Sequence, residues 1–313
     1  MTDKKLISIV TPCYNEEENV DDLHTQIVQV MSELPEYDFE HIYIDNASTD
    51  GTVPILRKLA AADRRVKVIL NTRNFGHIRS PYHALLQAHG NAVICMAADL
   101  QDPPHLIKDF IKKWEEGYKV VMGVKAHSQE TWLLFALRKL YYYILGGLSD
   151  VRLVANFTGF GLYDQQVVEI MREIDDPYPY ARGLIADIGF EAAKIEFIQP
   201  ARKRGMTKNN FYTLFDLAML GLTNNTKIPL RLATLMGFAT AAVSFVIGLF
   251  YLIYKLLNWQ TFELGLAPVV VGLFFFGAIQ LLFLGIIGEY IGAIYTQVLH
   301  RPLVIEKERI NFD

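Results

Sequence analysis

Two of the polar side chains in one short segment could bind a metal ion that in turn holds phosphate. Asp99, Gln101 and Asp102 lie within A-D-L-Q-D-P-P at residues 98–104. Carboxylate and amide oxygens are hard ligands, of the kind that Mg²⁺ or Mn²⁺ takes when it also binds substrate phosphates. The segment therefore predicts a divalent cation held by Asp99 and Gln101. Asp102 precedes Pro103-Pro104, a position that favours a helix cap.

Apolar, strand-like segments precede this and other groups of polar residues. We expect buried strands at residues 6–10, 41–45, 66–70, 92–96 and 120–124, with helices between them. Alternating strands and helices indicate a mostly parallel α/β sheet, whose ligands bind at the carboxyl ends of the strands. Besides the 98–104 segment, the polar residues that follow these strands are Tyr14, Asn15, Glu16, Asp45, Asn46, Arg73, Asn74 and Lys125. Each could be an ordinary turn or cap residue, but five groups at one edge favour a single binding crevice.

Several other classes of protein are excluded by composition and motifs. No G-x-G-x-x-G follows the first strand and no G-x-x-x-x-G-K-[ST] occurs, which disfavours dinucleotide-dependent redox enzymes and P-loop hydrolases. The net charge of −4 gives no support to nucleic-acid binding. The two cysteines, Cys13 and Cys95, lie in or after predicted strands and indicate core residues, not a disulfide framework or a zinc site.

Two long apolar segments lie near the C-terminal end. Residues 232–254 and 264–288 contain no charged side chain, and the mean hydropathy of the whole chain is +0.19. A helix over 232–254 would be about 35 Å long, enough to cross a hydrocarbon core of about 30 Å. Both segments are apolar on every face, which disfavours two buried helices of a soluble core. We therefore expect two transmembrane helices.

Positive residues flank these predicted spans on their outer sides. Lys227 and Arg231 precede the first span, and Arg301, Lys307 and Arg309 follow the second. The positive-inside bias places the large N-terminal domain and both termini in the cytoplasm, in a multi-pass protein of the inner (plasma) membrane. The N-terminal apolar stretch is too short for a signal peptide. The expected units are a domain at 1–200, a juxtamembrane segment at 201–228, two spans within 229–300 and a cytoplasmic tail at 301–313.

The juxtamembrane segment combines cations with apolar side chains at helical spacing. Arg202, Arg204 and Lys208 precede the apolar residues Phe211, Tyr212, Leu214, Phe215, Ala218, Met219 and Leu222. This pattern suits an amphipathic helix at the bilayer interface. It is equally typical of a helix packed on the globular domain or on a neighbouring subunit, and residues 137–144 raise the same two alternatives.

A set of motifs occurs in the order found in a known family. They are T-P-C-Y-N-E-E-E-N at 11–19, I-D-N-A-S-T-D-G-T at 44–52, R-N-F-G at 73–76, A-D-L-Q-D-P-P at 98–104, R-K-R-G-M-T-K at 202–208, I-P-L-R at 228–231 and G-E-Y-I-G at 288–292. The set covers nearly the whole chain and resembles the family 2 glycosyltransferases of GT-A fold. More narrowly, it resembles the polyprenyl-phosphate glycosyltransferases, namely the bactoprenol glucosyltransferases and dolichyl-phosphate mannose synthases. The resemblance implies a GT-A, Rossmann-like sheet with helices on both faces.

The resemblance also implies a role for each matching residue. The metal set would be Asp99 and Gln101, holding Mg²⁺ or Mn²⁺ on the donor diphosphate. The catalytic set would be Asp99, Lys125, Arg202 and Arg204, with the two arginines meeting the acceptor phosphate or the donor diphosphate. Substrate-binding positions would be Pro12, Tyr14, Glu16, Asp45, Asn74, Asp102, Asp187 and Lys208, of which the first four would contact the base and ribose of the nucleotide.

The chain departs from the pattern of the family at a few positions. Ala97 replaces the first Asp of the D-x-D motif, and Gly159 and Gly161 replace the Asp and Arg of N-x-G-D-F-R-L. Gly159 suits a phosphate acceptor, because a phosphate monoester with a second pKa of about 6 attacks without a base. A sugar hydroxyl would need one, and Asp102 and Asp187 are the reserve candidates for that role.

The activity implied by the resemblance is the inverting transfer of a hexose to a polyprenyl phosphate at the cytoplasmic face. We expect UDP-glucose as donor, undecaprenyl phosphate as acceptor and a homo-oligomeric membrane enzyme. One alternative keeps the lipid but uses GDP-mannose or an amino sugar. Another, favoured by Ala97 and Gly159, is a catalytically weak assembly subunit. A processive polysaccharide synthase is disfavoured, because two spans do not readily form a polymer channel and no Q-x-x-R-W occurs.

Overall fold

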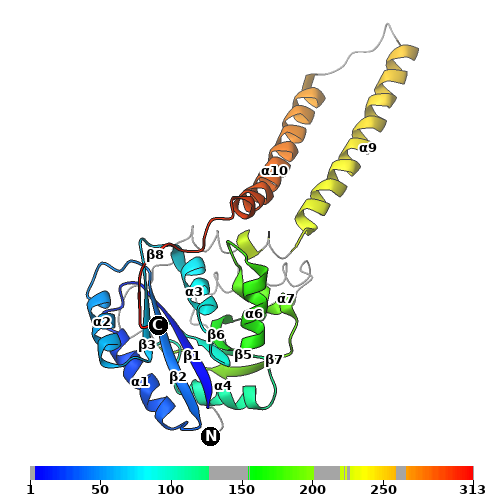
Figure 1. Cartoon of the computed structure of the whole chain (residues 1–313). Helices are drawn as coiled ribbons and strands as arrows, with labels where there is room; N and C mark the ends of the chain where they lie inside the picture. Colours follow the sequence, from blue (N-terminus) through cyan, green and yellow to red (C-terminus); the bar gives the residue numbers. More distant parts are fainter. Residues whose placement is uncertain are drawn as a thin grey trace.

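An eight-stranded sheet with helices on both faces carries two long helices that project from one end (Figure 1). The computed structural model describes residues 4–126, 154, 156–200, 219–221, 223, 226–258 and 266–312. Within these ranges the strand order is β7-β5-β6-β4-β1-β2-β3-β8. The expected α/β class and the two C-terminal apolar helices are confirmed.

All five strands expected from the sequence are present. They are β1 (Lys5–Cys13), β2 (Tyr37–Asp45), β3 (Val66–Asn71), β4 (Ala92–Cys95) and β5 (Val120–Lys125). β1 pairs in parallel with β2 and β4, β2 with β3, and β5 with β7 (Ala192–Phe197). Their carboxyl ends therefore meet at one edge, which we call the carboxyl edge. Two strands run the other way, β6 (Phe157–Asp164) and β8 (Glu306–Ile310).

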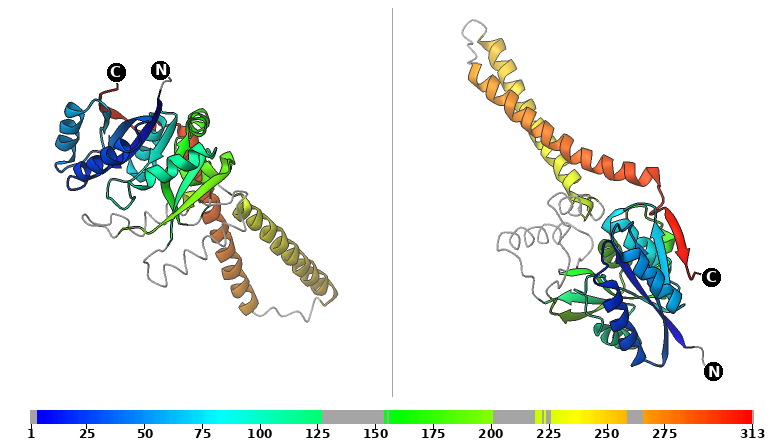
Figure 2. Two further views of the ribbon diagram at one scale, coloured as in Figure 1. Left: turned by 90° about the horizontal axis from the view of Figure 1, so that it is seen from below. Right: turned by 90° about the vertical axis from the view of Figure 1, so that its left-hand side faces the viewer.

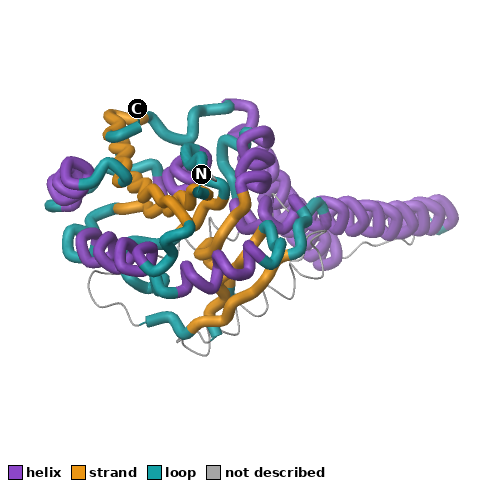
Figure 3. The backbone as a smooth tube through the Cα atoms, turned by 60° about the horizontal axis from the view of Figure 1, so that its bottom comes forward, coloured by secondary structure: helices purple, strands orange, loops and turns teal. Residues whose placement is uncertain are grey.

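The helices divide between the two faces of the sheet (Figure 3). One face packs against α1 (Val20–Ser32), α2 (Thr52–Ala62) and α4 (Leu106–Glu115), and the other against α3 (Gly76–Leu86), α6 (Gln165–Ile174) and α7 (Ala181–Ile188). In β1, Ile7 and Ile9 point to the first layer and Val10 to the second, and all three are buried. A sheet covered on both faces needs such continuous apolar strands.

The antiparallel strand β6 lies between β4 and β5, and a glycine allows it to fit there. A Cβ atom built on Gly161 would lie 2.3 Å from the carbonyl oxygen of Val121 in β5. The pairing of β5 with β6 also shifts register between Met122 and Val124. The side chain of an arginine, found at this position in the family pattern, has no room here unless the two strands separate.

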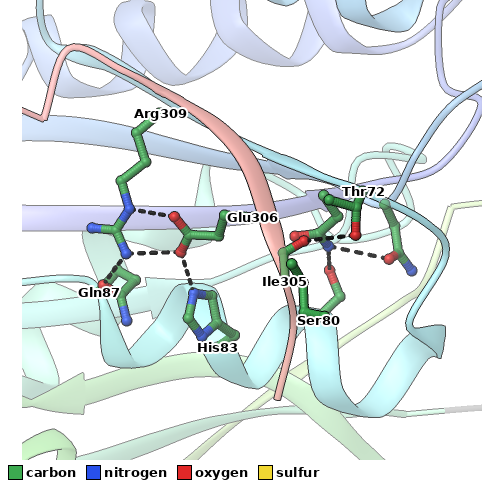
Figure 4. Close-up of polar contacts among 9 residues, drawn as sticks. Thr72, Ser80, His83, Gln87, Ile305, Glu306 and Arg309 are labelled. Atoms are coloured by element: carbon green, nitrogen blue, oxygen red, sulfur yellow. Dashed lines mark hydrogen bonds and ion pairs between the residues drawn. The ribbon is translucent and has the colours of Figure 1, made fainter. Parts of the chain in front are cut away.

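The last strand brings the C-terminal residues back to the sheet. Residues 301–313 were expected to form a tail, but Glu306–Ile310 form β8 and pair antiparallel with β3. Figure 4 shows the contacts that hold this strand. Glu306 accepts hydrogen bonds from His83 and Arg309, and Arg309 also donates to Gln87. The charged residues of β8 do not predict a strand. They are tolerated there because β8 is the last strand of the sheet and its side chains are partly exposed.

Two long apolar helices leave the α/β domain side by side (Figures 1 and 2). They are α9 (Ile228–Leu257) and α10 (Leu266–Leu299). Both are long and apolar enough to cross a membrane, and their large side chains are exposed, among them Phe238 at 72% and Phe274 at 73%. An exposed apolar surface of this size fits a lipid environment. α9 begins before and ends after the expected 232–254 segment. α10 begins at Leu266, inside the expected 264–288 segment, and extends beyond it to Leu299.

Candidate functional site

The loops after β1, β2 and β4 meet at the carboxyl edge, and each contains a residue in the left-handed backbone region. These residues are Asn15 at φ 55°, Ala47 at φ 61° and Leu100 at φ 60°. Alanine and leucine rarely adopt this conformation, which costs about 1–2 kcal/mol for an L-residue. Such strain concentrates at ligand-binding loops, where the surroundings hold the backbone in place.

The first two loops are joined by hydrogen bonds. The backbone N–H of Asn15 donates to Oγ of Ser48 at 2.9 Å, and the N–H of Thr49 donates to Oδ1 of Asn15 at 2.8 Å. The N–H of Glu16 donates to Oγ1 of Thr52 at 2.8 Å. These bonds place Pro12, Tyr14 and Glu16 beside Asp45, as the sequence predicts. All but Asp45 are half-buried.

Asp45 has an unused acceptor at this junction. Its side chain is only 1% exposed, and its Oδ2 accepts the backbone N–H of Ser48 at 3.0 Å. Its Oδ1 is buried and has no hydrogen-bond partner in the described part of the protein. Burial raises the pKa of Asp45 despite the opposing bonds from Ser48. A buried acceptor left open is costly unless a ligand donates to it, so Asp45 suits a hydroxyl or amide group of a ligand.

Asn74 lies at the same edge but bonds within the protein. Its Oδ1 accepts from Nδ2 of Asn46 at 2.8 Å and from the N–H of Gly76 at 2.7 Å. Asn46 also accepts from the N–H of Phe75 and donates to the carbonyl of Gly76. Asn46 therefore fixes the R-N-F-G loop from the end of β2. We named Asn46 from the sequence without assigning it a role, because turn asparagines are common.

The loop after β4 brings Asp99, Gln101 and Asp102 together with Lys125 at the end of β5. Oδ1 of Asp99 accepts the backbone N–H of Gln101 at 3.2 Å, which closes a tight turn. Asp102 is buried and accepts the backbone N–H of Ala97 at 2.9 Å. Burial and the Asp99 carboxylate raise the pKa of Asp102 to about 6, and Lys125 opposes them. The cap interpretation of Asp102 is wrong, because α4 begins at Leu106 after His105 without a side-chain cap.

These groups fit a divalent cation whose ligands come partly from the protein and partly from a substrate. The described residues contain no cluster of three His, Cys, Asp or Glu side chains able to enclose a metal. Mg²⁺ commonly uses only one or two carboxylates and completes its shell with phosphate oxygens and water. The half-buried Asp99 and Gln101 supply such a partial set, and Lys125 adds a positive charge beside it.

One expected site residue that the structure describes, Asp187, is not joined to this cluster, and three others lie in a segment that it does not describe. Asp187 is exposed near the end of α7, and no described hydrogen bond or ion pair connects it to the loops of the carboxyl edge. Arg202, Arg204 and Lys208 lie outside the described residues.

Gly159 adopts φ 104°, and nothing lies within 4 Å of where its Cβ would be. An aspartate there would therefore have space but a strained backbone.

The carboxyl edge is on the side of the domain from which α9 and α10 project (Figure 2). Asn71 at the end of β3 pairs with Glu306, and the backbone N–H of Thr72 donates to the carbonyl of Ile305 at 3.0 Å. Ile305 follows α10 by six positions. Near the end of α10, Nε2 of Gln297 donates to Oδ1 of Asp176 at 2.9 Å. The candidate site and the base of the two apolar helices therefore share one side of the domain.

Comparisons with known proteins identify relatives of this chain. A family model described as Glycosyl transferase family 2 matches residues 8–171. Glycosyltransferase YkcC of Bacillus subtilis, described as uncharacterized, is 35% identical over 95% of this chain and 92% of its own. A bactoprenol glucosyl transferase of Shigella phage SfV is 32% identical over 96% and 98%.

A solved structure is similar at a greater distance. It is the mannosyltransferase PcManGT from Pyrobaculum calidifontis in complex with GDP-Man and Mn²⁺. Its TM-score is 0.45 at 20% identity, over 65% of this chain and 59% of that one.

Proposed function

The chain belongs to glycosyl transferase family 2, and we propose that it transfers glucose from UDP-glucose to a polyprenyl phosphate with inversion. That it is a glycosyltransferase follows from the family and from relatives aligned over nearly its whole length. The bactoprenol glucosyl transferase of phage SfV supports a polyprenyl phosphate acceptor and, at a finer level, glucose. The two apolar helices on the side of the candidate site support a lipid acceptor in particular.

The observation that carries the proposal is that Asp99, Asp102 and Lys125 group at the same carboxyl edge as the unused acceptor of Asp45. Asp45 would accept a hydrogen bond from the ribose or base of the donor, whose diphosphate would extend toward Asp99 and Lys125. A divalent cation bound by Asp99 and Gln101 would supply charge stabilisation for the leaving diphosphate. Lys125 would add to this stabilisation from the end of β5.

The proposed reaction exchanges one bond at the anomeric carbon of the sugar. The bond to the diphosphate oxygen breaks, and the nucleoside diphosphate leaves with the electron pair. A phosphate oxygen of the lipid forms the new bond on the opposite face, which inverts the configuration. A phosphate monoester is largely dianionic at neutral pH, so no side chain needs to remove a proton. Gly159 at the position of the family's aspartate is consistent with such an acceptor.

Incubation of the purified full chain with undecaprenyl phosphate and labelled sugar donors tests the proposal. UDP-glucose, GDP-mannose and UDP-N-acetylglucosamine would be compared, with the lipid product extracted and its anomeric configuration determined. We expect the wild type to transfer glucose from UDP-glucose and Asp99→Asn to lose this activity. Asp109→Asn, a matched change at an exposed position of α4, should retain it.

Each other result has a defined meaning. Transfer from only one of the other donors would overturn the choice of glucose. A product with the donor's configuration would overturn inversion. No transfer from any donor would favour the assembly-subunit alternative. The homo-oligomer and the cytoplasmic position of both termini stay predictions.

A further inference from the structure

Three arginine side chains converge where the chain returns from α10 to the sheet. The guanidinium carbons of Arg73 and Arg79 lie over the same ring, that of Phe75, at 4.0 and 5.7 Å from its centroid. Arg79 also donates from Nη2 to the carbonyl oxygen of Pro302. Arg301 is the chain neighbour of Pro302 and is exposed. The R-N-F-G loop, the first turn of α3 and the segment after α10 therefore contribute one cation each.

The acids near this cluster bond to other groups: Asp175 pairs with His300, the chain neighbour of Arg301, at 3.2 Å. Across the ranges that the structure describes, none of the three arginines forms an ion pair with a carboxylate. Glu306 instead bonds to His83 and Arg309. Burial, together with the charges of Arg73 and Arg301, lowers the pKa of Arg79. Arginines held this close favour the binding of an anion.

Arg79 has a further feature of an anion site. Its Nε is buried and has no hydrogen-bond partner in the described structure. Its Nη2 is already committed to Pro302. An unused donor on a fixed guanidinium is well suited to a phosphate oxygen, because guanidinium groups bind phosphate in a planar, often bidentate geometry.

The surroundings of the cluster favour a lipid phosphate. Apolar side chains are exposed on both sides of Arg301 along the chain: Tyr295 at 62%, Val298 at 76% and Ile305 at 56%. α10 is one of the two helices with the length and hydropathy of a membrane span. Cations that follow an apolar helix lie at the depth of the headgroups when that helix enters the bilayer.

We propose that Arg73, Arg79 and Arg301 bind the phosphate of an anionic phospholipid headgroup in the leaflet that the α/β domain faces. The candidate active site uses the loops after β1, β2, β4 and β5 and, through Asn74, the loop after β3. The proposed headgroup site uses Arg73 of that loop, Arg79 of α3 and the segment after α10. It depends neither on the sugar donor nor on transfer. Such an anchor would hold the carboxyl edge at a fixed distance from the bilayer surface.

Thermal unfolding of the detergent-solubilised full chain, titrated with dioleoyl phosphatidylglycerol in mixed micelles, measures this binding. We expect phosphatidylglycerol to raise the Tm, and phosphatidylcholine at equal concentration not to do so. Each arginine replaced by glutamine should weaken the apparent affinity about fivefold, and the triple variant about a hundredfold. A matched control replaces three exposed cations away from this side, Lys4, Lys58 and Lys112, and should retain the response.

Further arms separate the possible sources of phosphate. Inorganic phosphate that raises the Tm as much as phosphatidylglycerol would overturn the headgroup assignment. So would a triple variant that loses only its response to undecaprenyl phosphate and keeps its response to phosphatidylglycerol, since the cluster would then serve the acceptor. If the triple variant does not fold, Arg301→Gln alone decides, because this exposed side chain is not needed for packing. An unchanged affinity in a folded Arg301→Gln would contradict the proposal.

Discussion

The two halves of the sheet present different surfaces at the carboxyl edge. In the half formed by β1, β2, β3 and β4, the loops carry polar side chains that bond one another and leave Asp45 Oδ1 open. In the half formed by β5, β6 and β7, the family pattern expects an aspartate and an arginine, but the chain has Gly159 and Gly161. At the carboxyl edge the first half presents most of the polar side chains of the candidate site. The second half adds Lys125, and its Gly161 lets β6 pack against β5.

The largest expected effect is in the second half. Gly161→Arg should destabilise the protein by at least about 3 kcal/mol or prevent folding, because even its Cβ would lie 2.3 Å from the Val121 carbonyl oxygen. Gly159→Asp should cost only about 1–2 kcal/mol, because its φ of 104° is strained but its space is open. Thermal unfolding of both variants measures the difference. Equal losses would contradict the packing explanation.

The first half should instead lose activity without losing its fold. Asp99→Asn should lower transfer by about a hundredfold or more, since charge stabilisation of a leaving diphosphate is worth several kcal/mol. The far-ultraviolet circular dichroism spectrum and the Tm should stay close to those of the wild type. The rates of Asp99→Asn and of the control Asp109→Asn are compared at saturating donor. Similar transfer rates in the two variants would show that Asp99 has no role in the transfer.

Asp102 should make the stability of this half depend on pH. Its pKa is raised to about 6 by burial and by Asp99, so the folded state holds a proton that the unfolded state releases near pH 4. Stability should fall as the pH rises from about 4 to 6, by roughly 3 kcal/mol, and then level off. Urea unfolding in the presence of a chelator measures it. In Asp102→Asn this slope should disappear, and a slope that persists would assign it to other groups.

Asp45 should show a conflict between stability and ligand binding. Because burial raises the pKa of Asp45, its ionised form destabilises the folded state at neutral pH, and Asp45→Asn should increase the Tm without ligand. The same change should weaken donor binding about tenfold, through loss of one buried acceptor. Isothermal calorimetry with UDP measures the affinity. A variant with unchanged affinity would show that Oδ1 does not face the donor.

The smallest effect is expected at β8, on the outer edge of the first half. Burial opposes ionisation of Glu306, but hydrogen bonds from Arg309 and His83 lower its pKa overall. Glu306→Gln should therefore lower stability by about 1 kcal/mol at pH 7. The loss should vanish as the pH falls through this lowered pKa. Glu308→Gln, which removes an exposed pair with Arg57, is the control and should change stability less.

The sequence predicts β1 to β4 in the first half but only β5 in the second. The five predicted strands are continuous apolar runs, which is the strongest local signal of a covered parallel sheet. β8 is E-K-E-R-I and half exposed, so its charges resemble those of a solvated tail. β6 contains Thr158, Gly159 and Gly161, which are typical of a turn. In both strands the pairing partner, which lies far away in the sequence, decides the structure.

The sequence also predicts where part of the candidate site lies. Strand ends identified Asp45, Asp99, Gln101 and Lys125, because the edge they share follows from topology alone. The cap prediction for Asp102 failed because only the folded loop shows that it bonds back to Ala97. The converging arginines had no signal either, since Arg301 reaches Arg73 and Arg79 through a contact between segments far apart in the sequence, that of Arg79 with Pro302.

The position of β8 also sets the order in which the protein can be completed on the ribosome. Arg57 and Glu308, which are paired across this edge, are 251 positions apart. At about 5–20 residues per second, translation of that interval takes roughly 10 to 50 seconds. Until then β3 has an open edge, where an exposed strand invites pairing with other chains. Both apolar helices must therefore be synthesised before the sheet can close, and a fragment shortened before α9 would keep that edge open permanently.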